Sequence, residues 1–174
     1  MLIKFILCVI IFSGCSAVGN LFAKNLEKRT AALVNLEAAV VMLNSRMKYY
    51  SEPVKSMLLN TGKAIKGETG KLFCEVSESM TENLNCVDAM HLALDRAKNK
   101  KGYIGALTKS DEAILADLFE RVGLDRGAQT AAFDFAKNRI ESVLSEAQYK
   151  KNQLAKLYKT AGMLIGALVA IIFI

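Results

Sequence analysis

The hydrophobic positions of this chain follow two patterns, an unbroken apolar run at each end and a helical repeat between them. Residues 5–23 form a run of 19 without a charge, and residues 160–174 form a second run of 15. A bilayer core about 30 Å thick needs roughly 20 apolar residues of helix. The first run meets this length. The second covers only ~22 Å, although Lys159 can extend its apolar stem along the lipid. The pattern predicts two membrane spans.

Between the runs, apolar residues recur every three or four positions, which is typical of amphipathic helices. After the first run the repeat comprises Leu33, Leu36, Val40, Leu43, Met47 and Tyr50. Before the second run it comprises Phe133, Ala136, Ile140, Val143 and Ala147, then Leu154, Leu157 and Ala161. We therefore expect each span to continue as a long helix, the first ending near Pro53 and the second capped by Asp125 and about 48 residues long. The two helices are antiparallel, so their apolar stripes can face each other.

Four shorter helices are predicted in the middle of the chain. They cover residues 53–64 and 69–80, a segment after Asn85, and a segment opened by a capping box from Thr108 to Asp111. The expected fold is all-α, a bundle of about six helices whose long N- and C-terminal helices are continuous with two transmembrane spans. The expected division is a first span with its junction, the bundle, and a second span, at residues 1–25, 26–158 and 159–174.

The charges beside the two runs predict the orientation of the chain in the membrane. The basic residues just inside the spans are Lys24, Lys28, Arg29, Lys150, Lys151, Lys156 and Lys159. On the other side lie only Lys4 and the amino terminus. The positive-inside rule therefore places the bundle in the cytoplasm. The net charge of +6 lies mostly in the bundle, and this favours membrane lipids with anionic headgroups over nucleic acid as a partner.

An alternative interpretation starts from the sequence Phe12-Ser13-Gly14-Cys15, which looks like the cleavage and lipidation site of a bacterial lipoprotein. It would make the chain an exported lipoprotein-type envelope binding module. Two observations oppose it: the chain stays apolar after Cys15, and the lysines before the second run would lie on the wrong side of the membrane. Whether Cys15 carries a lipid stays open.

Residue patterns typical of enzymes are missing from the sequence. Residues 62–71 are rich in glycine and lysine, but Ile65 and Leu72 depart from the phosphate-binding loop, so a turn between helices is the preferred interpretation. His91 is the only histidine, and Cys74 and Cys86 lack the spacing of metal ligands. We therefore expect that the protein is not an enzyme and binds no cofactor or metal. The rival hypothesis is a membrane enzyme of unfamiliar type.

Small residues repeat at four-residue intervals inside both predicted spans. In the second span they are Gly162, Gly166 and Ala170, and in the first they are Cys15, Gly19 and Ala23. Small residues let helix backbones approach closely in lipid. The pattern predicts helix packing, either between the two spans or with another protein, which includes a second copy of the chain.

These features together resemble the stage III sporulation protein AB family over nearly the whole chain. Residues that fit the pattern of the first half of the family are Ala23, Lys24, Leu33, Leu36, Leu43, Tyr49, Pro53, Leu72 and Phe73. In the second half they are Leu107, Ser110, Leu115, Gly123, Asp125, Gln129, Lys159, Gly162, Leu164 and Gly166. The chain departs from the family in lacking tryptophan, in its shorter turn from Gly123 to Asp125, and in having Arg46 where an acidic residue is common.

The resemblance implies a non-enzymatic role in endospore formation. The family looks like part of a secretion-type complex that links mother cell and forespore after engulfment. Its domain is similar to the cytoplasmic helical domain of type II secretion inner-membrane platform proteins. By this resemblance the chain lies in the mother-cell membrane around the forespore, faces the cytoplasm, and contacts other channel subunits, including a secretion-type ATPase. A homo-oligomer is compatible with this interpretation.

Overall fold

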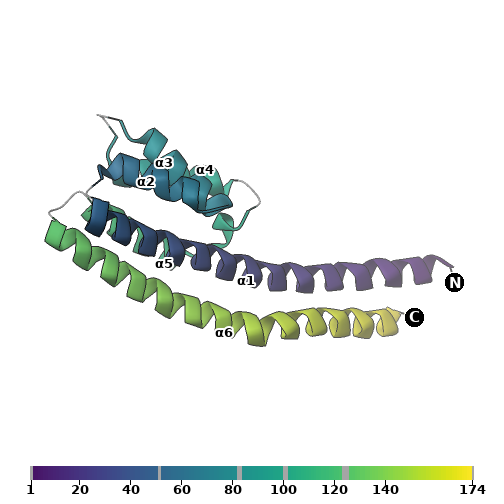
Figure 1. The fold of residues 1–174 in the computed structure, drawn as a ribbon. Helices are drawn as coiled ribbons and strands as arrows, with labels where there is room; N and C mark the ends of the chain where they lie inside the picture. The colour runs from purple at the N-terminus through teal and green to yellow at the C-terminus, as the bar shows by residue number, and fades with distance from the viewer. Residues whose placement is uncertain (1, 51, 82–83, 100–101, 123–125, 174) are drawn as a thin grey trace. The chain divides into compact units, whose positions relative to one another are not determined.

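The computed structural model describes residues 2–50, 52–81, 84–99, 102–122 and 126–173, without the side chains of residues 2–8, 126–128, 170, 172 and 173. Its elements are α1 (Leu2–Tyr50), α2 (Val54–Ala64), α3 (Glu68–Ser79), α4 (Cys86–Lys98), the short 3-10 helix η1 (Ile104–Ala106), α5 (Lys109–Arg121) and α6 (Arg126–Phe173) (Figure 1). Over these residues the fold is all-α, as predicted, with four short helices between two long ones. The short helix η1 lies between α4 and α5, where the sequence analysis predicts no helix.

Local sequence signals place the ends of the short helices. Pro53 precedes the first residue of α2, a position where its missing N–H is harmless. The side chain of Asn85 accepts a hydrogen bond from the Asp88 N–H at 2.9 Å and so caps α4. At the start of α5 both hydrogen bonds of the predicted capping box between Thr108 and Asp111 are present. The predicted cap of α6, Asp125, lies outside the described residues.

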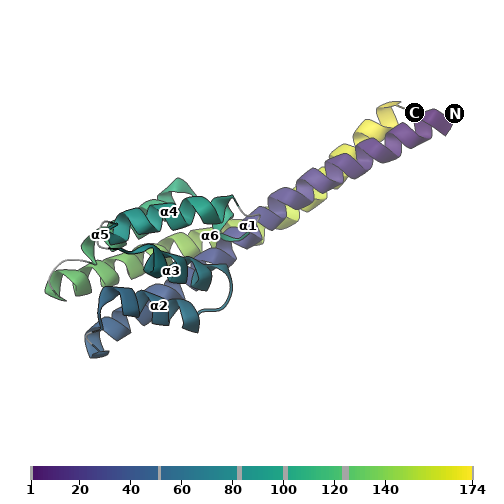
Figure 2. The same cartoon turned by 90° about the horizontal axis from the view of Figure 1, so that it is seen from above.

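The chain divides into two compact units, which are described separately. One unit comprises residues 28–145, and the other comprises residues 1–27 together with 146–174. In the unit of residues 28–145, called the bundle below, α2, α3 and α4 lie side by side in one layer over the α1 and α6 segments of the same unit (Figure 2). The other unit, called the hairpin, contains the outer segments of α1 and α6.

The core of the bundle consists of the predicted helical stripes. In α1 the stripe from Leu33 to Met47 is buried, and Phe133, Ala136 and Ile140 are buried in α6. The prediction was wrong for Tyr50, which is 69% exposed because α1 has already passed the end of the core. The four short helices α2 to α5 complete the core with Leu58, Phe73, Met90, Ile114, Leu115 and Leu118, among others.

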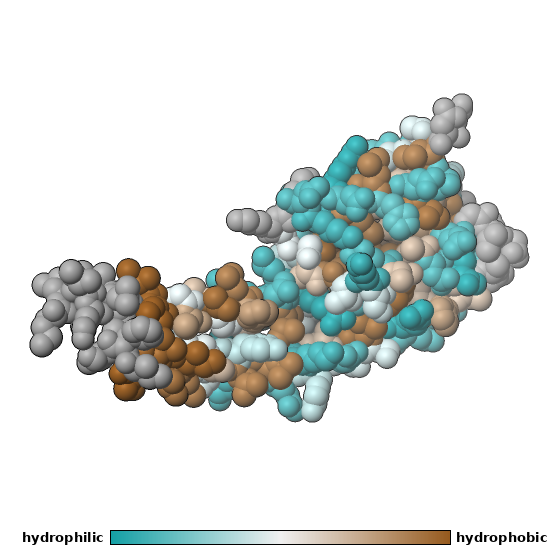
Figure 3. Space-filling model, turned by 180° about the vertical axis from the view of Figure 1, so that it is seen from behind, coloured by the Kyte–Doolittle hydropathy of each residue, from teal (hydrophilic) through white to brown (hydrophobic). Residues whose placement is uncertain are grey.

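The hairpin exposes apolar side chains instead of burying them. Figure 3 shows hydrophobic residues over the visible face of this unit, and hydrophilic residues widely distributed over the bundle. The helix segment Val9–Tyr50 is long and apolar enough to cross a membrane, and 11% of its most apolar stretch is buried. Among the described residues no second helix meets that criterion. The span at residues 159–174 therefore stays a prediction, although α6 continues as a helix to Phe173.

Candidate functional sites

The small residues predicted for membrane-helix packing lie where the two segments of the hairpin meet. A Cβ added at Gly19 would come 2.5 Å from the Tyr158 carbonyl oxygen and 3.2 Å from the Cα of Gly162. A Cβ added at Gly166 would come 3.2 Å from the Cβ of Cys15. All three distances are shorter than ordinary van der Waals contact, so the helix backbones lie in close contact. The side chain of Ala170 lies outside the described part of the structure.

A substitution at this contact is expected to separate the two helices. In Gly162→Val the new side chain would begin 2.9 Å from the Cys15 carbonyl oxygen, so we expect a cost of about 1–3 kcal/mol. Thermal unfolding of the full chain in detergent, followed by circular dichroism, measures the loss. Gly14→Ala is the matched control, because a Cβ there has no neighbour within 4 Å. Equal melting temperatures for the two variants would contradict the packing.

An apolar groove runs along the hairpin beside this contact. It has a volume of about 490 Å³ and is lined by residues of both helix segments, including Gly14, Val18, Ala161 and Ile165. The rings of Phe22 and Tyr158 also line it and lie 5.7 Å apart between centroids. Because its walls are apolar, the groove offers packing surface and no reactive group.

The basic residues predicted to set the topology have different surroundings. Lys24 and Lys156 are exposed. Within the hairpin, Lys159 forms an ion pair with Glu27 at 3.3 Å, and Lys150 forms one with Glu146 at 2.5 Å. Such exposed pairs contribute little to stability. The other two lysines of the set, Lys28 and Lys151, are half-buried.

Arg29, the remaining member of that set, is engaged inside the bundle. Its Nε and Nη2 atoms each donate a hydrogen bond of 2.9 Å to the carboxylate of Asp111, whose side chain is fully buried. The same carboxylate accepts the Thr108 N–H at 2.9 Å in the capping box. The pair ties the first turn of α5 to α1. Sequence reasoning found the capping box but missed this partner, because the two residues lie 82 positions apart.

The pairing predicts a loss of stability in acid. Burial alone would raise the pKa of Asp111, but hydrogen bonds from Arg29 and Thr108, with the Arg29 charge, outweigh it and hold the pKa below its usual value. Because the pKa of Asp111 is lower in the folded state, its ionised carboxylate stabilises the fold at pH values above the unfolded-state pKa of about 3.9. This stability is lost as the pH falls through the folded-state pKa.

We therefore expect the stability difference between the wild-type chain and Asp111→Asn to narrow as the pH falls below about 4. Urea unfolding in detergent at a series of pH values measures it. Asp117→Asn is the control, because Asp117 forms only an exposed pair with Arg121. A difference that stays constant down to the lowest pH at which the chain still folds would count against the assignment.

The glycines that suggested a phosphate-binding loop have a packing role in the structure. A Cβ on Gly70 would overlap the carbonyl oxygen of Ile65 and come 2.5 Å from that of Gly62, so α2 and α3 cross at their backbones. Gly67 joins the helices with φ of +89°, a conformation that favours glycine. The preferred interpretation of this segment as a turn between helices agrees with this geometry.

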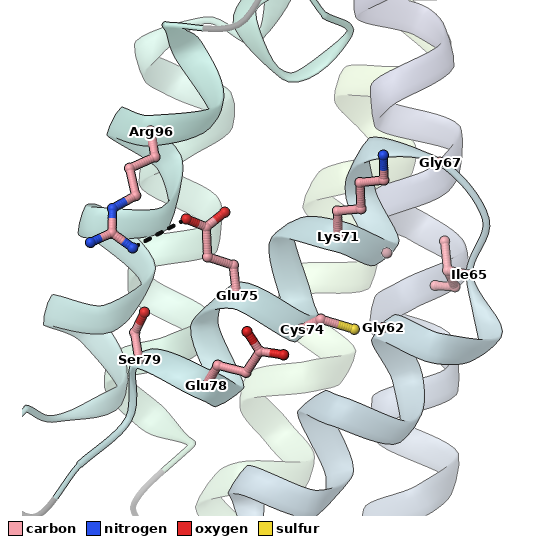
Figure 4. Close-up of a pocket in the computed structure, with 10 residues that line it drawn as sticks. Gly62, Ile65, Gly67, Lys71, Cys74, Glu75, Glu78, Ser79 and Arg96 are labelled. Atoms are coloured by element: carbon pink, nitrogen blue, oxygen red, sulfur yellow. Dashed lines mark hydrogen bonds and ion pairs between the residues drawn. The ribbon is translucent and has the colours of Figure 1, made fainter.

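An open groove of about 640 Å³ lies beside this crossing and is shown in Figure 4. Cys74 points from α3 towards Gly62, while Glu75 forms an ion pair with Arg96 of α4 at 3.3 Å. Lys71 extends away from that pair towards the turn at Gly67. The groove has charges of both signs on its surface, and the Cys74 thiol donates to the Leu59 carbonyl oxygen at 4.0 Å.

The remaining candidates for chemistry are single residues. In the part of the chain that the structure describes, no three His, Cys, Asp or Glu side chains could together hold a metal ion. His91 is exposed on α4. Burial raises the pKa of Cys86 to about 12, so its thiol stays protonated and unreactive at neutral pH.

Comparisons with known proteins identify relatives of this chain. The sequence model of the family described as stage III sporulation protein AB matches residues 4–174. A solved structure described as stage III sporulation protein AB matches with a TM-score of 0.63 at 20% identity, over 72% of this chain and 98% of that one. At that identity the structural match shows the fold alone. No curated protein sequence matches the chain.

Proposed function

We propose that this chain, which belongs to the stage III sporulation protein AB family, is a membrane-anchored platform in the secretion-like channel between mother cell and forespore. Family membership gives it a role in sporulation. Its place in the channel, its anchoring in the membrane and its mode of action are proposed here. In this proposal the hairpin holds the bundle at the mother-cell membrane, and the bundle contacts a secretion-type ATPase or the subunits of a membrane-embedded ring from the cytoplasm.

The match of the family over residues 4–174 carries this proposal, because it includes both apolar ends as well as the bundle. Membrane anchoring is supported by the apolar, largely unburied first half of α1. The inward orientation is supported by exposed lysines such as Lys24 and Lys156, which follow the positive-inside rule. Two spans that hold the bundle on the cytoplasmic side of the membrane keep it within reach of a soluble ATPase.

A non-enzymatic mode of action is supported by the family, which is a sporulation family and no known enzyme family. The described surface offers ion pairs, apolar faces and grooves, which suit protein and lipid contact. On α1, Val34 and Val41 are 43% and 42% exposed, and Tyr49 is 80% exposed, along one side of the helix. Exposed apolar side chains at a spacing of seven and eight residues can receive a partner helix.

The exported lipoprotein remains the second candidate, and the surroundings of Cys15 bear on it. Cys15 lies inside α1, and its backbone and Cβ face Gly162 and Gly166 of α6. A cleaved and lipidated Cys15 would begin the chain and remove the helix turns before it. Incorporation of labelled fatty acid into the wild-type chain and its absence in Cys15→Ser would support that candidate and contradict a two-span platform.

Deleting the gene in an endospore-forming host tests the proposed function. We expect engulfment to proceed and spore formation to stop afterwards, with restoration by the wild-type chain expressed in the mother cell. A chain lacking residues 1–23 is the control for anchoring, and we expect it to fail to restore spores. Normal sporulation in the deletion strain would overturn the proposal.

Crosslinking in sporulating cells tests the mode of action. We expect the secretion-type ATPase of the same complex to be recovered with the full-length chain. A variant with Val34, Val41 and Tyr49 changed to serine is expected to keep its fold, since these side chains are exposed, and to recover less ATPase. Recovery of channel subunits without the ATPase would restrict the platform to the membrane ring.

A further inference from the structure

Two loops at one end of the bundle are rich in lysine. Residues 63–71, around the turn from α2 to α3, contain three lysines and one acidic residue, Glu68. Residues 98–99 and 102–109, the described part of the connection between α4 and α5, contain Lys98 and Lys109 and no acidic residue. We call these two segments together the basic end of the bundle.

The loops at the opposite end of the same helices have a different composition. The described residues of 50–54, 79–86 and 121–126 together contain one acidic and two basic residues. The described residues of the basic end contain five lysines and one acidic residue, so the excess of positive charge is larger there. A charge difference of this kind between two ends orients a domain in the field of a charged surface.

Glu68 holds the two loops of the basic end together. Its carboxylate accepts hydrogen bonds from the backbone N–H groups of Tyr103 and Ile104, the second at 3.0 Å. The contact requires a glycine at position 102, because a Cβ there would overlap the Glu68 carboxylate. Lysines that are distant in the sequence are thereby gathered on one surface. The carboxylate of Glu68 on this surface is already bound to backbone N–H groups.

Four lysines of the basic end are exposed and, over the described residues, form no ion pair. They are Lys63, Lys66, Lys71 and Lys109. A fifth, Lys98, forms an ion pair with Glu112 at 2.7 Å. Four unpaired ammonium groups on one surface repel one another, and an anionic partner relieves this repulsion.

The basic end is also the end at which the chain arrives from the first predicted span. The pair between Arg29 and Asp111 ties the start of α5 to α1. Arg29 follows Ala23, the last residue of the uncharged run, by six positions, which is about 9 Å of helix. This length is comparable to the Debye length, which is about 8 Å at physiological ionic strength. A charged membrane surface attracts lysine side chains that lie within about this distance of it.

We infer that the basic end binds the anionic phospholipid headgroups of the membrane in which the chain is anchored. The inference rests on the proposed anchoring and adds a specific contact to it. Each lysine near an anionic leaflet favours contact roughly fivefold, so four together favour it on the order of several hundredfold. The contact holds the bundle against the membrane and fixes which face remains open to a cytoplasmic partner.

The test uses a single introduced tryptophan, because the chain has none. Tyr103→Trp places it in the basic end at a half-exposed position. The full-length chain is reconstituted in nanodiscs of phosphatidylcholine, with or without phosphatidylglycerol, that carry a nitroxide on some headgroups. We expect strong quenching only with phosphatidylglycerol. It should be lost at high salt and in the variant Lys63→Gln, Lys66→Gln, Lys71→Gln, Lys109→Gln.

A matched variant changes four basic residues outside the basic end, namely Lys48→Gln, Lys55→Gln, Arg121→Gln and Lys137→Gln. It removes the same charge and should leave the quenching intact. Tyr49→Trp places the tryptophan at the opposite end, where it should be quenched in neither lipid. Equal quenching of the tryptophan at 103 in both lipids, or quenching that survives loss of the four lysines, would overturn the inference.

Two further outcomes separate this inference from the proposed function. A chain that does not enter the nanodiscs overturns the anchoring and the lipid contact together, whereas an anchored chain without quenching overturns the lipid contact alone. Loss of a crosslinked channel subunit in the four-lysine variant, with unchanged quenching, would assign the basic end to an acidic protein and would also overturn the lipid contact.

Discussion

Replacing Gly70 by alanine is expected to destabilise the bundle by about 3 kcal/mol. The new Cβ would overlap the Ile65 carbonyl oxygen and approach the Gly62 carbonyl oxygen to 2.5 Å. Both are backbone atoms, so no side chain can turn aside, and α2 must move away from α3. A loss of this size lowers the melting temperature of a chain of this length by about 6–12 °C. Thermal unfolding in detergent, followed by circular dichroism, measures it.

Gly67→Ala is the informative control for this prediction. A Cβ at Gly67 has no neighbour within 4 Å, but φ of +89° with ψ of −156° is strained for alanine and costs about 1–3 kcal/mol. Gly67→Ala should therefore be the milder change of the two. If the two variants melt together, the close crossing of α2 and α3 is wrong, and the glycines serve only the turn.

Replacing Asp111 by alanine is expected to cost about 3 kcal/mol, near the lower end of the range for a broken buried ion pair. The change removes two hydrogen bonds to Arg29 and the carboxylate of the capping box. It leaves a guanidinium group that is only 15% exposed without the Asp111 carboxylate. Urea unfolding of the full chain at neutral pH measures the loss, and hydrogen exchange should increase first in α5.

A double-mutant cycle separates the ion pair from the helix cap. Arg29→Met keeps an unbranched apolar stem and removes the guanidinium group, so the coupling energy with Asp111→Ala reports on the pair. Asp117→Ala serves as the control on the same helix, and its exposed pair with Arg121 should contribute less than about 1 kcal/mol. A coupling energy near zero would show that the two side chains do not support each other.

Loss of the pair between Arg29 and Asp111 would also affect the proposed platform. The pair joins α5 to α1 a few residues after the uncharged run of α1. A bundle with a loosened α5 would keep its membrane anchor but lose the fixed geometry of the basic end. We therefore expect Asp111→Ala to reduce spore yield in the complementation assay while the chain stays in the membrane fraction.

Most of the fold follows from local features of the sequence. The three- and four-residue repeat predicts α1 and α6 and most of their buried faces, and Pro53, Asn85 and Thr108 mark the starts of short helices. These features are predictable because hydrophobic periodicity and helix capping act between residues a few positions apart. The repeat fails at Tyr50, because burial also depends on where the neighbouring helices end.

The functional surfaces depend more on tertiary structure. The sequence alone suggests that Arg29 is a topology-determining charge, yet its guanidinium pairs with a carboxylate 82 positions away. It likewise offers Gly62 and Gly70 as parts of a loop, whereas the structure places them where two helix backbones touch. The hydrogen bonds of Glu68 to the Tyr103 and Ile104 backbone join the turn that carries Lys63, Lys66 and Lys71 to the segment that leads to Lys109.

The sequence by itself determined the helical class, the family, the apolar ends and the overall charge of this protein. Only the tertiary structure decided which charged side chains are paired inside the bundle and which are exposed on its surface. The physical reason is that apolar periodicity is repeated along each helix, while an ion pair or a backbone crossing depends on two segments meeting in space. Such contacts leave no periodic signal in either segment.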